Sequence, residues 1–207
     1  MAFPTSSLTN NQVHKEGNRA FVYDSALGVW DQVKEISRSA GYMGGGSIFP
    51  TGLIIQTAHV MKTSTATISV ASNAEGTIPN FELKITPKYT SSKILIFWTV
   101  HAVAAGSNPC MGTLKRSGHG SINIGDASSN RARVGADNSN DTTYTIGGMS
   151  HTEMDSPNTT SEVTYTLGIR HHSSITRVVN INFTLGDSDN AHHPRTTSSM
   201  TAMEIAQ

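Results

Sequence analysis

The stretch GYMGGGSIFPTG at residues 41–52 is the first place where this sequence offers chemistry. Glycine-rich loops bind phosphate when their backbone N–H groups lie at the N-terminus of a helix. A phosphate loop has a Lys after its last glycine, and a dinucleotide loop leads into a helix. Here Gly44, Gly45 and Gly46 are contiguous, no Lys follows, and a Phe-Pro pair begins an extended segment. The stretch therefore indicates a hinge, for which glycine's permissive backbone is suited.

Nine histidines are the next candidates, and four of them form the adjacent pairs His171-His172 and His192-His193. Neighbouring residues on a strand point to opposite faces, so each pair is a poor bidentate metal site. One alternative stays open: in a symmetric trimer, one His from each chain at the axis would give a three-nitrogen site. Otherwise the sequence predicts polar surface or interface histidines. We expect no resident metal and no cofactor.

Nucleophilic and acid–base catalysis have no signature in the sequence. The hydrolase pattern G-x-S-x-G is absent, and Cys110, the single cysteine, has no catalytic motif around it. The D-S-D-N run at 187–190 lacks the Gly and Glu of a calcium loop. Paired carboxylates of the glycosidase type stay open, because their separation in space is not visible in the sequence. We expect a structural thiol at Cys110 and a protein that is not an enzyme.

Composition narrows the classes of partner. The chain has 207 residues, 15 basic and 15 acidic side chains, and only 14% charged residues. A neutral chain has no electrostatic attraction to nucleic acid or to an anionic membrane. The most apolar run, ILIFWTV at 94–100, is too short to span a bilayer, and the first residues do not read as a signal peptide. We expect a soluble protein that is made in the cytoplasm.

The elements that must position these residues are predominantly strands. From residue 53 onward, alternating apolar residues predict about nine or ten short strands separated by Gly, Pro, Asn, Asp and Ser. The run KILIFWTVHAVA at 93–104 predicts a central strand that is buried on both faces. Residues 126–142 are polar and predict a long surface loop. The pattern predicts an all-β protein whose residues 53–207 form a jelly-roll-like β-sandwich.

The N-terminal residues 1–40 predict a separate small region. The stretch RAFVYDSALGVWDQV places Phe21 and Tyr23 on one face of a strand and returns after a turn through Trp30. A lone hairpin is marginal in water, so we expect these aromatic side chains to lie against the main domain or another chain. The following stretch, 31–41, is either a short helix or an extended connector. The expected organisation is a hairpin region at 1–40, a hinge at 41–52 and the sandwich at 53–207.

Four stretches resemble segments of bacteriophage virion proteins. FPTSSLTNNQVHKEGNRAFVYDSALGVWDQV is similar to a segment of tail-fibre and appendage proteins of phages that infect marine bacteria. Three later stretches resemble, in family order, a domain at the ends of such proteins. They are ITPKYTSSKILIFWTV, MDSPNTTSEVTYTLGIR and TTSSMTAMEIAQ. None of these motifs is catalytic, so the resemblance carries over no catalytic residue.

The resemblance implies a virion structural protein that forms a homotrimer. Phe21, Tyr23 and Trp30 would anchor the chain to a capsid or tail protein, and the C-terminal domain would project beyond the glycine hinge. Since no shaft separates the matched regions, the resemblance favours a short head fibre, a capsid decoration protein or a small tail appendage. One alternative is a tail-fibre adhesin whose 126–142 loop binds a host surface saccharide. Another is a polysaccharide hydrolase or esterase.

Overall fold

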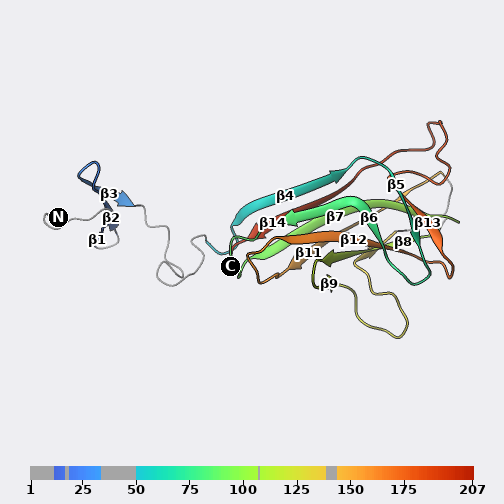
Figure 1. Cartoon of the computed structure of the whole chain (residues 1–207), viewed down its shortest axis with the longest axis horizontal. Coiled ribbons are helices and arrows are strands. Elements are labelled where there is room, and N and C mark those ends of the chain that lie inside the picture. Colours follow the sequence, from blue (N-terminus) through green and yellow to red (C-terminus); the bar gives the residue numbers. More distant parts are fainter. Residues whose placement is uncertain (1–11, 17–18, 34–49, 107, 139–143) are drawn as a thin grey trace. The chain divides into compact units, whose positions relative to one another are not determined.

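The computed structural model describes residues 12–16, 19–33, 50–106, 108–138 and 144–207 (Figure 1). The chain separates into two compact units, Met1–Pro50 and Thr51–Gln207. Every regular element in the described ranges is a β-strand, so the predicted all-β class is confirmed. Nowhere in these ranges does a helix have the length and apolarity needed to cross a membrane.

The smaller unit contains a three-stranded antiparallel sheet of β1 (Val13–Glu16), β2 (Arg19–Asp24) and β3 (Val29–Val33). The turn between β2 and β3 is stabilised by Asp24. Its Oδ1 accepts hydrogen bonds from the backbone N–H groups of Ala26 and Leu27. The predicted hairpin is therefore present, and β1 adds a strand that the sequence pattern did not predict. Of the stretch 31–41, the first three residues belong to β3 and the others lie outside the described residues.

The first sheet of the larger unit is built around β7 (Lys93–Ala104), which pairs on both edges. One edge pairs with β11 (Gly147–Asp155). The other edge pairs first with β14 (Ser198–Ile205) and then with β13 (Arg177–Ile181). Beyond these lie β4 (Ile54–Lys62), which pairs with β14, and β5 (Ala66–Val70), which pairs with β13.

The second sheet has β12 (Val163–His171) between β6 (Gly76–Ile85) and β8 (Cys110–Arg116). The outer edge of β8 pairs with two short strands, β9 (Gly120–Ser121) and β10 (Ala136–Asp137). From β4 to β14 the chain passes repeatedly from one sheet to the other. Three pairs of strands, β4 with β5, β9 with β10, and β13 with β14, can each be counted as one strand. The eight strands that result, numbered along the chain, are ordered 1-8-3-6 in the first sheet and 2-7-4-5 in the second. This is the order of a jelly roll.

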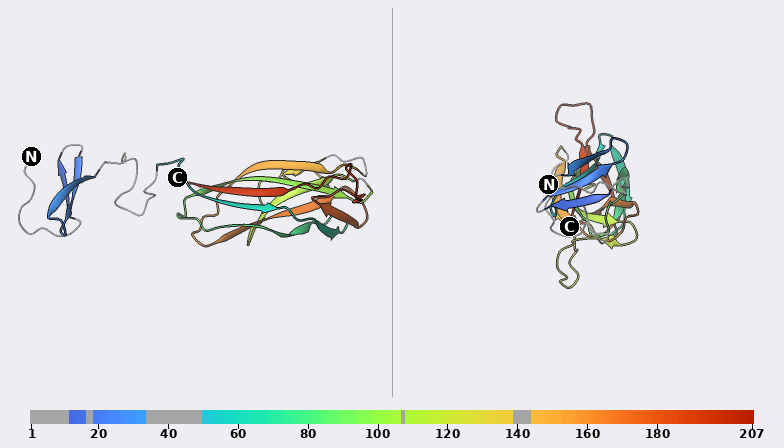
Figure 2. Two further views of the ribbon diagram at one scale, coloured as in Figure 1. Left: turned by 90° about the horizontal axis from the view of Figure 1, so that it is seen from above. Right: turned by 90° about the vertical axis from the view of Figure 1, so that its left-hand side faces the viewer.

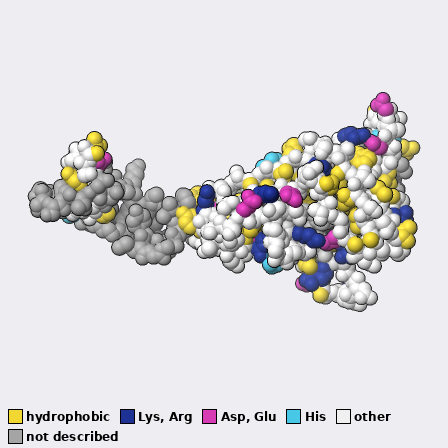
Figure 3. All heavy atoms as spheres, in the orientation of Figure 1, with side chains coloured by type: hydrophobic (Ala, Val, Ile, Leu, Met, Phe, Trp, Pro, Cys, Tyr) yellow, Lys and Arg dark blue, Asp and Glu magenta, His cyan; other side chains and the backbone are white. Residues whose placement is uncertain are grey.

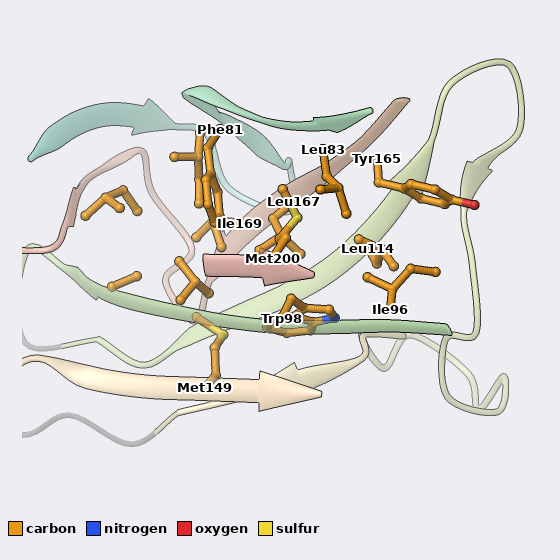
Figure 4. Close-up of a cluster of buried hydrophobic side chains, with 14 of the residues drawn as sticks. Phe81, Leu83, Ile96, Trp98, Leu114, Met149, Tyr165, Leu167, Ile169 and Met200 are labelled. Atoms are coloured by element: carbon orange, nitrogen blue, oxygen red, sulfur yellow. The ribbon is translucent and has the colours of Figure 1, made fainter. Parts of the chain in front are cut away.

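The hydrophobic core lies between the two sheets. Figure 4 shows side chains of both sheets pointing toward one another, and full burial of a large apolar side chain is worth about 1.5–3 kcal/mol. Trp98 of β7 lies so close to β8 that a Cβ on Gly112 would meet its ring at 2.8 Å, which explains the glycine there. The labelled core residues are Ile96, Trp98, Met149 and Met200 from the first sheet and Phe81, Leu83, Leu114, Tyr165, Leu167 and Ile169 from the second.

Two predictions about individual segments need correction. The strand at 93–104 is central, as predicted, but its first half is not buried on both faces, since Phe97 is 41% exposed. The sequence pattern also missed β11, because GGMSHTEMD places only two apolar side chains in nine positions. The predicted loop at 126–142 contains β10 near its end. In Figure 2 the segment between β9 and β10 and the segment after β13 project from opposite sides of the sandwich.

Candidate functional site: an uncharged sheet face

A buried ion pair joins the two sheets. Asp155 of β11 accepts two hydrogen bonds from Nη1 of Arg116, at 2.7 and 2.8 Å, and a third from the Tyr165 hydroxyl at 2.7 Å. Burial, and then the bond to Asp155, raise the pKa of the Tyr165 phenol. Asp155 and Tyr165 both come from the stretch MDSPNTTSEVTY that resembles virion proteins. In this chain the two residues therefore hold the sandwich together.

A second buried carboxylate connects the C-terminal strand to the turn between β6 and β7. Glu204 is fully buried, and its Oε1 accepts hydrogen bonds from the backbone N–H groups of Lys88, at 2.7 Å, and Tyr89, at 3.4 Å. The side chain of Gln56 donates to the other oxygen and to the carbonyl of Thr86. The stretches TTSSMTAMEIAQ and ITPKYTSSKILIFWTV thus contact each other, and Glu204 has a structural role.

Glu153 is a third buried carboxyl, and it is only half satisfied. Trp98 Nε1 donates to its Oε1 at 3.0 Å, while Oε2 has no hydrogen-bond partner among the described residues. Burial raises the pKa of Glu153, against the opposing effects of Trp98, His151 and Asn123. A Cβ on Gly135, in the predicted 126–142 loop, would lie 3.2 Å from Oε1, so the loop closes over this carboxyl.

The histidine pairs and the cysteine also have local partners. Nε2 of His171 donates to the Val70 carbonyl at 2.8 Å, and its Nδ1 accepts from a backbone N–H at 3.0 Å, while His172 is exposed. His193 contacts a threonine hydroxyl at 3.0 Å. In the part of the chain that the structure describes, no three His, Cys, Asp or Glu residues are grouped to hold a metal ion. Cys110 is fully buried, and burial raises its pKa to about 12.

The residues predicted to anchor the protein come together in the smaller unit. Phe21 is buried, and the rings of Tyr23 and Trp30 pack with their centroids 5.3 Å apart. The register pairs Tyr23 with Trp30, so all three side chains lie on one face of the small sheet. The predicted hinge residues Gly44, Gly45 and Gly46 lie outside the described residues.

The outer face of the first sheet of the larger unit is almost free of charge. Alternation along the strands turns Glu153, Asp155 and Glu204 inward and leaves Lys93 at one end as the only charged residue on the face. Large apolar side chains stand exposed among hydroxyl groups. We call this surface the uncharged face; it comprises Thr57, His59, Met61, Leu95, Phe97, Thr99, Ser150, Thr152, Met154, Ser199, Thr201 and Met203.

The uncharged face has a shallow hollow beside Phe97. A broad, open hollow of about 500 Å³ lies over β7 and β11. Phe97 lies at this hollow and is 41% exposed, while Met154 and Met61 are 42% and 56% exposed. On one side of Phe97, His59 and Thr201 bind each other at 2.8 Å. The residues that line the hollow are Phe97, Trp98, Thr99, Ser150, His151 and Thr152.

The chain itself covers part of the remainder of this sheet. Val103 and Asn180 lie on the same outer face, near β13, yet both are buried. The segment after β13 folds over them, and the amide of Asn180 donates to the carbonyl of Thr184 at 3.2 Å. The ring of His101 binds the carbonyl of Thr197 at 2.9 Å at the border. The described chain therefore leaves the uncharged face bare, together with the exposed residues Thr67, Ser69 and Val178 at the β5 edge of the sheet.

The outer face of the second sheet differs in composition. It carries Glu82 and Lys84 on β6, and Lys115 on β8 forms an ion pair with Glu75 at 2.5 Å. Arg170 of β12 also lies on this face. Figure 3 shows one side of the molecule, on which basic and acidic side chains are interspersed. Mixed charge of this kind is typical of a solvated surface.

No family model matches this chain, and no curated protein matches it significantly. What the chain does is therefore inferred from its own residues. Sequence reasoning missed the uncharged face because ILIFWTV is apolar at its odd-numbered and even-numbered positions alike. Such a run predicts a strand that is buried on both sides. The neighbouring strands did indicate a face without charge. In TAMEIA and IIQTAHVM, both faces of the strand carry apolar and uncharged polar residues, and Glu204 is the one charged side chain.

Proposed function

We propose that this chain is a non-enzymatic structural protein of a bacteriophage virion, a homotrimeric appendage or capsid decoration protein. The observation that carries the proposal is the uncharged face, because apolar side chains on a bare sheet favour association with another protein surface. The jelly-roll order is compatible with it, since viral capsid proteins use this fold, as lectins also do. Three acids with structural partners, Asp155, Glu153 and Glu204, lie inside the sandwich and offer no exposed catalytic pair.

The smaller unit is proposed to attach the protein to the particle. Its three strands form a compact unit of their own, and Tyr23 and Trp30 present an aromatic pair on one face. Leu27 and Val29 are exposed in and after the turn. Aromatic residues are enriched in the buried centres of protein interfaces, so Phe21, Tyr23 and Trp30 are the proposed contacts with a capsid or tail protein.

Particle incorporation tests the anchoring role. Phage carrying the full chain and phage carrying a chain without residues 1–40 are purified, and the protein is quantified in each by mass spectrometry. The full chain is expected in particles, and the shortened chain is expected only in the lysate, with its sandwich folded. Equal incorporation of both chains would contradict anchoring by the smaller unit.

A receptor-binding adhesin is the second candidate, favoured by one observation. The segment between β9 and β10 projects from the sandwich (Figure 2), and its residues 125–133 are exposed throughout. Arg131 and Arg133 lie in it and offer hydrogen-bond donors to saccharide oxygens. Purified protein should then bind host cells and block phage adsorption, and removal of both arginine side chains should abolish the block. Adsorption that continues at saturating protein would exclude this role.

A further inference from the structure

We propose that the uncharged face is the surface through which copies of this chain associate with one another. The inference rests on the proposed homotrimeric function and adds to it the sheet that forms the contact. The occupants of the face are further copies of the same chain: around a three-fold axis, the β4, β14, β7 and β11 regions of the three copies meet one another.

Charge is the first argument for a second copy. A surface with charges of its own would bury them against a face that has no acidic side chain, and unpaired buried charges cost several kcal/mol. A second uncharged face brings no such penalty. Lys93, the single charged residue, lies at the end of the face, where it stays in contact with water. The second sheet, with Glu82 and Lys84, lacks this property.

Hydroxyl groups supply the second argument. Ser and Thr side chains donate and accept hydrogen bonds, so two identical hydroxyl-rich surfaces can satisfy each other. Surfaces rich in Lys or Glu cannot do so, because each presents only donors or only acceptors. The uncharged face carries hydroxyls on all four of its strands, and three of them, Thr99, Ser150 and Thr152, line the hollow at Phe97. Its hydroxyl residues are Thr57, Thr99, Ser150, Thr152, Ser199 and Thr201.

Size is the third argument. On β7 the face runs over the seven residues from Lys93 to Thr99, so at about 3.4 Å per residue it is about 24 Å long. Four strands spaced about 4.8 Å apart make it roughly 19 Å wide, or roughly 450 Å² of flat sheet. Protruding side chains increase the accessible area, so the face supplies the larger part of the roughly 800 Å² that each partner contributes to a stable interface. Phe97 lies near its centre, where aromatic residues contribute most to binding.

The first experiment places a charge at the centre of the face. Light scattering is recorded over a dilution series for the wild-type full chain, Phe97→Glu and the matched control Ile175→Glu. Ile175 is also an exposed apolar residue, but it lies in the loop before β13. We expect Phe97→Glu to weaken association at least tenfold, with wild-type circular dichroism, and Ile175→Glu to leave it unchanged. An oligomer that survives Phe97→Glu overturns the inference but not the proposed oligomeric function, whereas a monomeric wild type contradicts both.

The second experiment does not depend on the folding of Phe97→Glu. Cys110 is buried, so a cysteine placed on the surface is the only thiol that reacts with a bulky maleimide. Thr152→Cys, on the uncharged face, is expected to be protected in the oligomer and to react upon dilution to monomer. Ile175→Cys is expected to react at all concentrations. Full reactivity of Thr152→Cys in the undiluted oligomer would overturn the inference.

Discussion

The two outer faces of the sandwich are built from strands of the same alternating type, yet they differ in what they present. On the second sheet, Glu82, Lys84 and Lys115 alternate with the core residues. On the first sheet, the corresponding outward positions of β7 hold Leu95, Phe97 and Thr99. Fold stability requires only that one side of each strand be apolar. Charge on the other side of β7 is limited to Lys93 at its end, which is more than folding requires and supports the proposed association.

The largest expected effect is a difference in the free energy of unfolding between variants of a buried and of an exposed carboxylate. Asp155→Ala leaves the partly buried Arg116 without its partner, and breaking a buried pair costs about 3–5 kcal/mol. Glu82→Ala, on the charged face, is expected to change stability by less than about 0.5 kcal/mol. Urea denaturation of both variants measures the difference. Equal, small losses would show that the ion pair between the sheets does not hold the sandwich together.

The second effect contrasts the two faces with the same substitution. Thr99→Lys places a charge on the uncharged face, and Thr166→Lys places one on the outer face of β12. We expect the first to weaken association at least tenfold, about 1.4 kcal/mol, and the second to leave it unchanged. Sedimentation equilibrium gives both constants. If Thr166→Lys were the disruptive variant, the contact would lie on the charged sheet instead.

A smaller effect concerns pH and Glu153. Burial raises the pKa of this carboxyl above its ordinary value of 4.5, so the folded chain holds the proton more tightly than the unfolded chain. The stability that this proton confers is present below pH 4.5 and is lost as the pH rises through the raised pKa. Glu153→Gln should therefore melt progressively higher than the wild type as the pH rises from 4.5 to neutral. A difference in melting temperature between the two chains that stays constant from pH 4.5 to neutral would contradict a raised pKa of Glu153.

The smallest effect is expected from metal removal. His59 is the histidine on the uncharged face, and its Nδ1 is already engaged with Thr201. Treatment with a chelator should therefore leave the mass of the oligomer and its melting temperature unchanged. A loss of the oligomer that Zn²⁺ restores would instead support three histidines meeting at a symmetry axis, and His59→Gln would then abolish the restoration.

The sequence was sufficient for the fold class because period-two patterns such as FELKI and SEVTYTLGIR leave one face apolar. It did not predict β11, because the inward positions of this strand include the acids Glu153 and Asp155. Acidic residues are expected at the surface, and the partners that allow these two to be buried, Arg116, Tyr165 and Trp98, are known only from the structure. The uncharged face was missed for the opposite reason. In the sequence Phe97 is indistinguishable from a core residue, and only its 41% exposure in the folded chain shows that the described residues leave it uncovered.

Light scattering from the purified 207-residue chain is the measurement that tests self-association most directly. A stable oligomer of three times the chain mass of 22.1 kDa is expected at micromolar concentration and above. With Thr99→Lys, the fall of this mass to that of a single chain should occur at concentrations at least tenfold higher than for the wild type, and Thr166→Lys should not shift it. A wild-type chain that stays at 22.1 kDa throughout the dilution series would contradict the account.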